Sequence, residues 1–176
     1  MSAGWSVHLG HGASGSAASM AAYVEGLARR GFSAAAVQLP KGSAERAMPA
    51  FLGQSGEGAS VVVGGQSFGG RVASLLAAQH RFGALLLFSY PLHRPGHRGE
   101  LRTDHWPDIR CPVLLLSGES DPFADLQLLR REVVRIPDHR LVTFPRAGHG
   151  FRGPLLEEAL DHAAAFLSEL GPERGQ

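Results

Sequence analysis

The sequence predicts an α/β fold with a doubly wound, mostly parallel sheet of about six strands and helices on both faces. Six short runs rich in Val, Leu and Ala recur along the 176 residues, and segments with the spacing of amphipathic helices lie between them. The runs lack alternating polar residues, as is typical of strands buried on both faces. Because a parallel connection needs about a dozen residues and usually contains a helix, the alternation of runs and helical segments favours parallel pairing.

The apolar runs predict the strands, and each run is followed directly by Gly, Ser or Pro, which interrupt regular structure. In chain order, the expected strands are Trp5–Leu9, Ser33–Leu39, Val61–Val63, Ala84–Phe88, Val113–Leu116 and Arg140–Phe144.

Four intervening segments predict helices. From Met20 to Leu27, apolar residues recur at i, i+3, i+4 and i+7, and Gly31 follows a basic pair, as helix C-termini favour. The second segment, Ala44–Leu52, is the weakest candidate because Pro49 interrupts it. The other two expected helices run from Phe68 or Gly70 to His80 and from Pro154 to Leu170, the latter ending at Gly171-Pro172.

The stretch between Tyr90 and Pro112 reads as a long loop, because it holds several prolines and few apolar residues. Its histidines, His93, His97 and His105, are the obvious metal candidates in the chain. The prolines make a helix there unfavourable, so the spacing of these histidines does not form a ligand set. We expect a solvated or site-covering loop, no metal and no other cofactor.

Composition excludes several classes of function. With 17 Lys+Arg against 16 Asp+Glu, the chain has no excess of positive charge to attract nucleic acid or an anionic membrane. The single cysteine, Cys111, cannot form an internal disulfide, which favours a reducing, cytoplasmic location and a small buried thiol. No apolar run approaches the roughly 18–20 residues that span a bilayer, and Met1–Gly10 lacks the pattern of a signal peptide.

The length predicts one domain over residues 1–170 with a polar tail over residues 171–176, since domains have roughly 100–200 residues. No internal repeat is visible.

A motif with chemical meaning follows the third predicted strand, where Gly65-Gln66-Ser67-Phe68-Gly69 matches the G-x-S-x-G pattern of a nucleophile elbow. Small neighbours two positions either side allow a sharp strand-to-helix turn that exposes the serine. In a chain with 23 glycines the pattern alone is weak evidence. Its position between a buried strand and a helix, where parallel sheets present ligands, favours a nucleophile over a simple helix cap.

A serine nucleophile needs a base and a group that orients the base, in the chain order Ser, Asp/Glu, His for this elbow. Asp121 follows the fifth predicted strand and His149 follows the sixth, so both lie at the same sheet edge as Ser67. The glycines beside His149 free its loop to place the imidazole. Glu119 and Asp125 are rival acids, and Asp121 is the preferred one.

The oxyanion of an acyl-transfer reaction needs backbone N–H donors. One donor is expected from Phe68, which follows the nucleophile, and the second from Ala13, in the glycine-rich loop after the first strand. We also assign two substrate-binding candidates, Gln66 and His11, although the favoured role for His11 is that of a core or loop-bracing histidine.

These motifs resemble the α/β-hydrolase superfamily, and within it a small lidless group that includes dienelactone-hydrolase-like proteins and the hydrolase-like domains of testis-expressed and NSL-complex proteins. The resemblance runs from Val7 to about Leu167 and rests on HLGHGASG, GGQSFGGR, SYPLHRPG, LRTDHWPDIRCPVLLLSGESDPF and RAGHGF. It implies Ser67 as nucleophile, Asp121 as acid and His149 as base, in agreement with the chain order. It also implies a minimal sheet of six strands without a lid.

Two functions follow as expectations. The first is a serine hydrolase that acts on a small ester or thioester through an acyl-enzyme, with a small-molecule acyl substrate as its partner. The alternative is a catalytically weak or inactive protein that uses the hydrolase fold as a binding module for a protein partner, because some relatives are scaffolds. The sequence leaves the oligomeric state open.

Overall fold

A computed structural model describes residues 4–172 of the chain, and its centre is a six-stranded sheet in the order β2-β1-β3-β4-β5-β6. All strand pairings in this sheet are parallel, which confirms the predicted fold class. The strands are β1 (Ser6–Gly10), β2 (Ser33–Val37), β3 (Gly58–Gln66), β4 (Phe82–Phe88), β5 (Val113–Gly118) and β6 (His139–Phe144). The tail predicted over residues 171–176 lies outside the described residues from position 173 onward.

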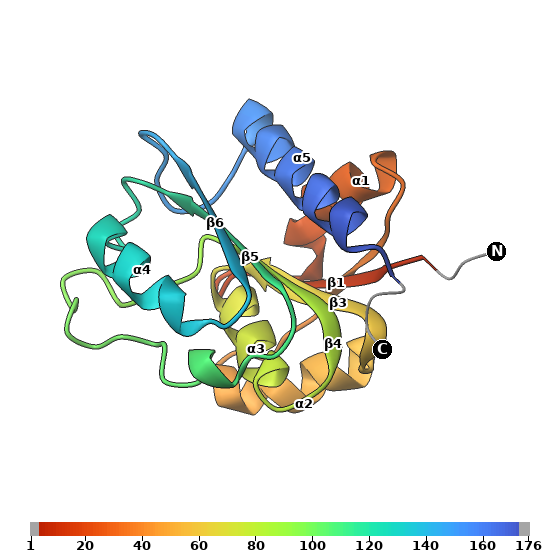
Figure 1. The fold of residues 1–176 in the computed structure, drawn as a ribbon, viewed down its shortest axis with the longest axis horizontal. Helices are drawn as coiled ribbons and strands as arrows, with labels where there is room; N and C mark the ends of the chain where they lie inside the picture. Colours follow the sequence, from red (N-terminus) through yellow and green to blue (C-terminus); the bar gives the residue numbers. More distant parts are fainter. Residues whose placement is uncertain (1–3, 173–176) are drawn as a thin grey trace.

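Helices cover both faces of the sheet (Figure 1). One face carries α1 and α5, and the other carries α2, α3 and α4. The α-helices are α1 (Ala21–Arg29), α2 (Ala44–Ser55), α3 (Phe68–Ala77), α4 (Leu126–Glu132) and α5 (Gly153–Leu170), and the 3₁₀ turns are η1 (Ala17–Met20), η2 (Trp106–Asp108) and η3 (Val133–Arg135). Within residues 4–172, none of the helices is long and apolar enough to cross a membrane.

The continuous apolar runs are explained by burial on both faces of the strands. In β4, Leu85 and Leu87 pack against the layer of α2 and α3, whereas Leu86 and Phe88 pack against the layer of α1 and α5. All four side chains are fully buried. Because successive side chains of a strand point to opposite faces, a strand between two helical layers needs apolar residues at every position.

Two helical segments differ from the prediction. Helix α2 continues through Pro49, because Ala47 and Phe51 are buried in the core and Ser43 caps its first turn by accepting the N–H of Arg46. Helix α4 was not predicted, and it is too short for its periodicity to stand out. Its signal is the capping residue Asp125, which accepts the N–H of Leu128 at 3.0 Å.

The segment between β4 and β5 is more buried than a solvated loop. Leu92, Trp106 and Ile109 are fully buried within the core beside α3, and the Tyr90 hydroxyl donates to the Arg102 carbonyl at 2.6 Å. The expectation of a solvated loop is therefore wrong for these apolar residues, which are too widely spaced in sequence to form a pattern. His105 also belongs to this packing, since its Nε2 lies 2.8 Å from the Ser74 hydroxyl.

His105 should make the stability of the fold sensitive to acid. Burial, assisted by the charge of Arg71, lowers the pKa of His105 to about 4. Since the unfolded histidine titrates near 6.5, the unfolded chain binds the extra proton between pH 6.5 and 4, and the folded state loses stability as the pH falls through that window. This group should remove about 2–3 kcal/mol of unfolding free energy between pH 7 and 4.

Urea denaturation of the wild type and of His105→Gln at pH 7, 5.5 and 4 measures this contribution, with the exposed His162→Gln as the matched control. The His105→Gln variant should lose less stability on acidification than the wild type. Parallel pH dependence of the two proteins would contradict the prediction.

Candidate active site

Ser67 occupies a sharp turn between β3 and α3. Its backbone angles, φ 51° and ψ −114°, lie in a region that residues with a side chain rarely adopt. The turn is held by the Ser67 N–H, which donates to the Phe88 carbonyl of β4 at 2.9 Å. Such strain costs of order 1–3 kcal/mol and is concentrated at functional sites, so this geometry fits the nucleophile elbow that the sequence predicts.

Three glycines make this turn sterically feasible. Gly65 and Gly69 on either side of Ser67 lie directly against Gly10 at the end of β1. A Cβ atom on Gly69 would collide with the Gly10 backbone, and a Cβ atom on Gly65 would collide with the Gly10 carbonyl oxygen. Close contact between the elbow and β1 therefore requires glycine on both sides of the serine.

Asp121 lies in the turn after β5, and its carboxylate is completely buried. One oxygen, Oδ1, accepts the N–H of Phe123 at 2.8 Å, which fixes the orientation of the group. The other, Oδ2, lies 2.8 Å from Nδ1 of His149. The buried carboxylate thus has its charge directed at one imidazole nitrogen.

His149 lies in the loop after β6 and connects the acid to the serine. Its Nδ1 donates to Asp121, which leaves Nε2 unprotonated and able to accept from the Ser67 hydroxyl at 2.8 Å. The imidazole ring lies on the Phe123 ring, with centroids 4.3 Å apart, and its side chain is 21% exposed. The structure therefore brings Ser67, His149 and Asp121 into one hydrogen-bonded chain at the carboxyl edge of the sheet.

The rival acids have other partners. Glu119 accepts from the Thr143 hydroxyl at 2.8 Å. Asp125 caps α4 and lies 3.3 Å from the Arg98 guanidinium. Of these three acids, only Asp121 contacts the imidazole of His149.

One expected oxyanion donor, Phe68, directly follows Ser67, and the other, Ala13, lies in a turn of the loop after β1. Phe68 is the first residue of α3, where a helix leaves its N–H without an intrahelical partner. Ala13 is an exposed central residue of a turn closed by the Gly15 N–H and the Gly12 carbonyl, 3.0 Å apart. Among residues 4–172, no acceptor is found for the N–H of Phe68 or of Ala13, so both are available to a ligand.

The two substrate-binding candidates are placed differently. The Gln66 side chain extends toward Gly12 and lines a pocket beside His149. His11 is only 3% exposed, and both of its ring nitrogens are engaged, since Nδ1 donates to the Gly12 carbonyl and Nε2 accepts the Leu39 N–H. The structure thus gives His11 the loop-bracing role and not the expected contact with substrate.

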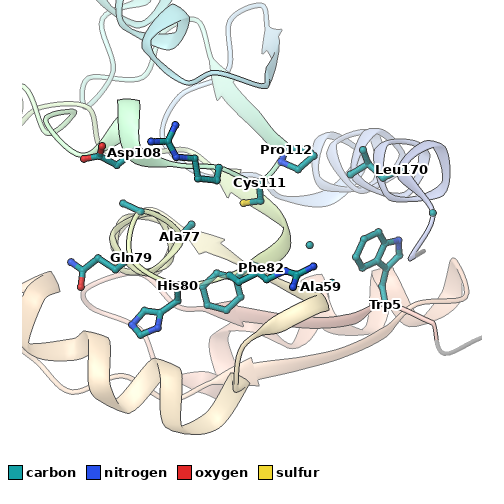
Figure 2. A pocket seen from close by; sticks show the side chains of 15 residues that line it. Trp5, Ala59, Ala77, Gln79, His80, Phe82, Asp108, Cys111, Pro112 and Leu170 are labelled. Atoms are coloured by element: carbon teal, nitrogen blue, oxygen red, sulfur yellow. The ribbon is translucent and has the colours of Figure 1, made fainter. Parts of the chain in front are cut away.

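A pocket of about 410 Å³ adjoins the His149 side of this site. It extends from the Gly12 loop across Tyr23 and Met20 of the α1 segment to Arg152 and Leu156 at the start of α5. A larger cavity of about 630 Å³ lies at the opposite edge of the sheet, where Trp5, Phe82 and Pro112 line it (Figure 2). No member of the Ser67–His149–Asp121 chain lines the larger cavity, so its size does not make it the reaction site.

A family model described as an alpha/beta hydrolase domain matches residues 40–166, which include all three residues of the hydrogen-bonded chain. The protein belongs to the α/β-hydrolase family. This membership supports the resemblance noted in the sequence, and the six-stranded parallel sheet is consistent with a minimal form of the fold.

Solved structures of similar fold include several enzymes. A monoacylglycerol lipase of Paleococcus ferrophilus has a TM-score of 0.76 at 18% identity, with 95% of each chain covered. The esterase Est2 of Thermogutta terrifontis has a TM-score of 0.73 at 22% identity, over 95% of this chain and 84% of the esterase. A dienelactone hydrolase-like promiscuous phosphotriesterase from metagenomic libraries has a TM-score of 0.71 at 21% identity, over 95% and 87% of the two chains.

The histidines of the long loop in this α/β-hydrolase point to separate partners. His93 is buried, with Nε2 accepting the Asp125 N–H at 3.0 Å and Nδ1 donating to the Arg94 carbonyl, whereas His105 contacts Ser74. Within the described part of the chain, no group of three side chains is placed to hold a metal ion. Burial raises the pKa of the Cys111 thiol to about 12, so it remains a protonated, small core residue.

His93 is a residue whose role the sequence did not reveal. The ring Nε2 of His93 accepts the Asp125 N–H, and the backbone N–H of His93 donates to the Phe123 carbonyl at 3.0 Å. Both contacts fix the segment that carries Asp121. The sequence places His93 in the segment SYPLHRPG but does not indicate its partner, because the two residues are 32 positions apart.

The contact between the elbow and β1 predicts a contrast between two glycine-to-alanine substitutions. Gly69→Ala forces a methyl group into the Gly10 backbone, so we expect destabilisation of 3 kcal/mol or more, roughly the cost of a severe core clash. Gly53→Ala in α2 meets no atom within 4 Å and should stabilise the protein by about 0.5–1 kcal/mol. Thermal and urea unfolding of both variants test the contrast, and a Gly69→Ala variant as stable as the wild type would refute it.

Proposed function

We propose that this α/β-hydrolase is a serine hydrolase that cleaves a small ester or thioester through an acyl-enzyme. The observation that carries the proposal is the pair of 2.8 Å hydrogen bonds that join Ser67 to His149 and His149 to Asp121. A nucleophile, a base and a group that orients the base are the parts this chemistry needs. The esterases and lipase of similar fold support an ester substrate.

In the proposed first half-reaction, Ser67 Oγ attacks the carbonyl carbon while its proton passes to His149 Nε2. Asp121 holds the imidazole in the Nδ1–H tautomer and stabilises the imidazolium that forms. The N–H groups of Phe68 and Ala13 stabilise the oxyanion of the tetrahedral intermediate. As the intermediate collapses, the carbon–oxygen or carbon–sulfur bond breaks, and the alcohol or thiol leaves with the proton from Nε2.

In the second half-reaction, a water molecule gives its proton to His149 Nε2 and attacks the acyl carbon. The second tetrahedral intermediate expels Ser67 Oγ, which recovers the proton and leaves a free carboxylic acid. No cofactor takes part in these steps. Because the His149 side chain is partly exposed, water can reach the imidazole.

The pocket of about 410 Å³ beside His149 supports a substrate with a small acyl or alcohol group. Gln66 lines this pocket and therefore stays a substrate-binding candidate.

The chain has a single cysteine and cannot form an internal disulfide, which supports the cytoplasm, a reducing compartment, as the proposed location. The competing function is a binding module that retains the fold without turnover, and labelling of the serine separates the two.

Labelling with a fluorophosphonate probe tests the role of Ser67. The folded wild type should be labelled, and Ser67→Ala should lose the label completely because the attacking oxygen is gone. Ser55→Ala, which removes a hydroxyl from α2, is the matched control and should label as the wild type does.

A panel of aryl esters of graded chain length, run on the same proteins, provides a kinetic test. The wild type should hydrolyse the shorter esters, and Ser67→Ala should lose at least about a thousandfold in kcat. Equal labelling of Ser67→Ala, or an unlabelled folded wild type that purifies with a protein partner, would refute the hydrolase.

Substitution of the acids tests the role of Asp121. Asp121→Asn should lower kcat by about a thousandfold or more, because an amide that donates to Nδ1 leaves the proton on Nε2 and removes the base. Glu119→Gln, which has the same loss of charge two residues away and contacts Thr143, should keep kcat within about twofold. Steady-state kinetics on one aryl ester provide the comparison, and a similar loss in both variants would exclude Asp121 as the specific partner of His149.

A further inference from the structure

Ser89 has an unusual backbone for a buried residue. It directly follows β4, is completely buried and has a φ of 54°. Among residues 4–172, Ser67, Ser89 and Arg146 are the non-glycine residues in this conformation. Glycine would adopt it without steric cost, so a serine at this position indicates that its side chain is needed.

The Ser89 hydroxyl holds the loop that carries His149. Its oxygen accepts the N–H of Gly150 at 3.0 Å. Gly150 directly follows His149, and neither Gly148 nor Gly150 has a side chain that could anchor the loop. Loss of the acceptor would leave the partly buried Gly150 N–H without this partner, and an unpaired N–H away from water costs free energy.

Ser89 and its neighbour Phe88 bring the serine and histidine segments to the same strand end. The Phe88 carbonyl accepts the Ser67 N–H at 2.9 Å, while the Ser89 hydroxyl accepts from the histidine loop. The Ser89 N–H also donates to the Leu116 carbonyl of β5 at 2.8 Å, which ties the same residue to the strand that precedes Asp121. Phe88 and Ser89 contribute no reacting group, yet between them they contact all three segments that do.

We propose that Ser89 is a positioning residue whose hydroxyl fixes the distance between His149 Nε2 and Ser67 Oγ. This inference rests on the proposed serine hydrolase activity. The hydroxyl acts through the Gly150 N–H and does not contact the reacting atoms. Because a displacement of about 1 Å in a reacting group can cost a hundredfold in rate, a loop released from this anchor should slow catalysis while substrate binding is retained.

Two substitutions distinguish the effect of the Ser89 hydroxyl from the effect of its strained backbone. Ser89→Ala removes the oxygen and keeps the strained backbone, whereas Ser89→Gly removes the oxygen and relieves the strain. Both variants should lower kcat for an aryl ester by about tenfold or more, with KM within about twofold of the wild type. Ser89→Gly should be at least as stable to urea as Ser89→Ala, so a kcat that follows stability is distinguished from a kcat that follows the hydroxyl. The control, Ser55→Ala, removes a hydroxyl at the end of α2 that donates to the Gly56 carbonyl, and it should keep both constants.

A kcat near the wild-type value in either Ser89 variant would overturn the proposal. So would a loss confined to Ser89→Ala, because it would show that stability and not the hydroxyl is responsible.

A second readout does not require turnover. The proton between His149 Nδ1 and Asp121 should give a proton NMR signal far downfield of the amides, and exchange with water should broaden it in both Ser89 variants but not in Ser55→Ala. If the wild type hydrolyses no ester and this signal still weakens, the proposed activity fails while the positioning role stands. An unchanged signal in both Ser89 variants would overturn the positioning role by itself.

Discussion

The parallel order of the sheet is the constraint on which the site depends. Because β3, β5 and β6 run in the same direction, the turns that follow them meet at one edge, and residues 82 positions apart come within hydrogen-bonding distance. The apolar strands and the helical layers on both faces hold this edge in place. The packed core therefore fixes the relative positions of Ser67, Asp121 and His149, although these residues themselves lie in short turns and loops.

Close approach of backbones is the second requirement, and it explains where glycine is concentrated. Gly10, Gly65 and Gly69 meet where β1, β3 and α3 converge, and a similar contact sets Gly118 at the end of β5 against the carbonyls of Ala147 and Gly148. The first contact allows the strained turn of Ser67, and the second brings the histidine loop against the strand that precedes the acid. Side chains at these glycines would separate the elements that must converge.

Two histidines outside the hydrogen-bonded chain stabilise the loops around it. His11 braces the loop that carries Ala13, and His93 braces the segment that carries Asp121. Each of these buried imidazoles accepts a backbone N–H from a segment about 30 residues away. The long segment between β4 and β5 completes the core beside α3, and through His93 it also stabilises the turn that carries Asp121.

Within residues 4–172, the sequence by itself determined the α/β class, the six strands and four of the five α-helices. It also singled out Ser67 and His149, with Asp121 as the preferred of three acids. It could do so because strand burial, helical periodicity and the order Ser, Asp, His are local or ordinal patterns along the chain. Only the tertiary structure decided that His149 contacts Asp121 and not Glu119 or Asp125, that His11 braces a loop, and that the histidines of the long segment lie apart. It also revealed the anchoring hydroxyl of Ser89. These facts depend on which side chains meet after strands far apart in sequence have packed, and no spacing in the chain encodes that outcome.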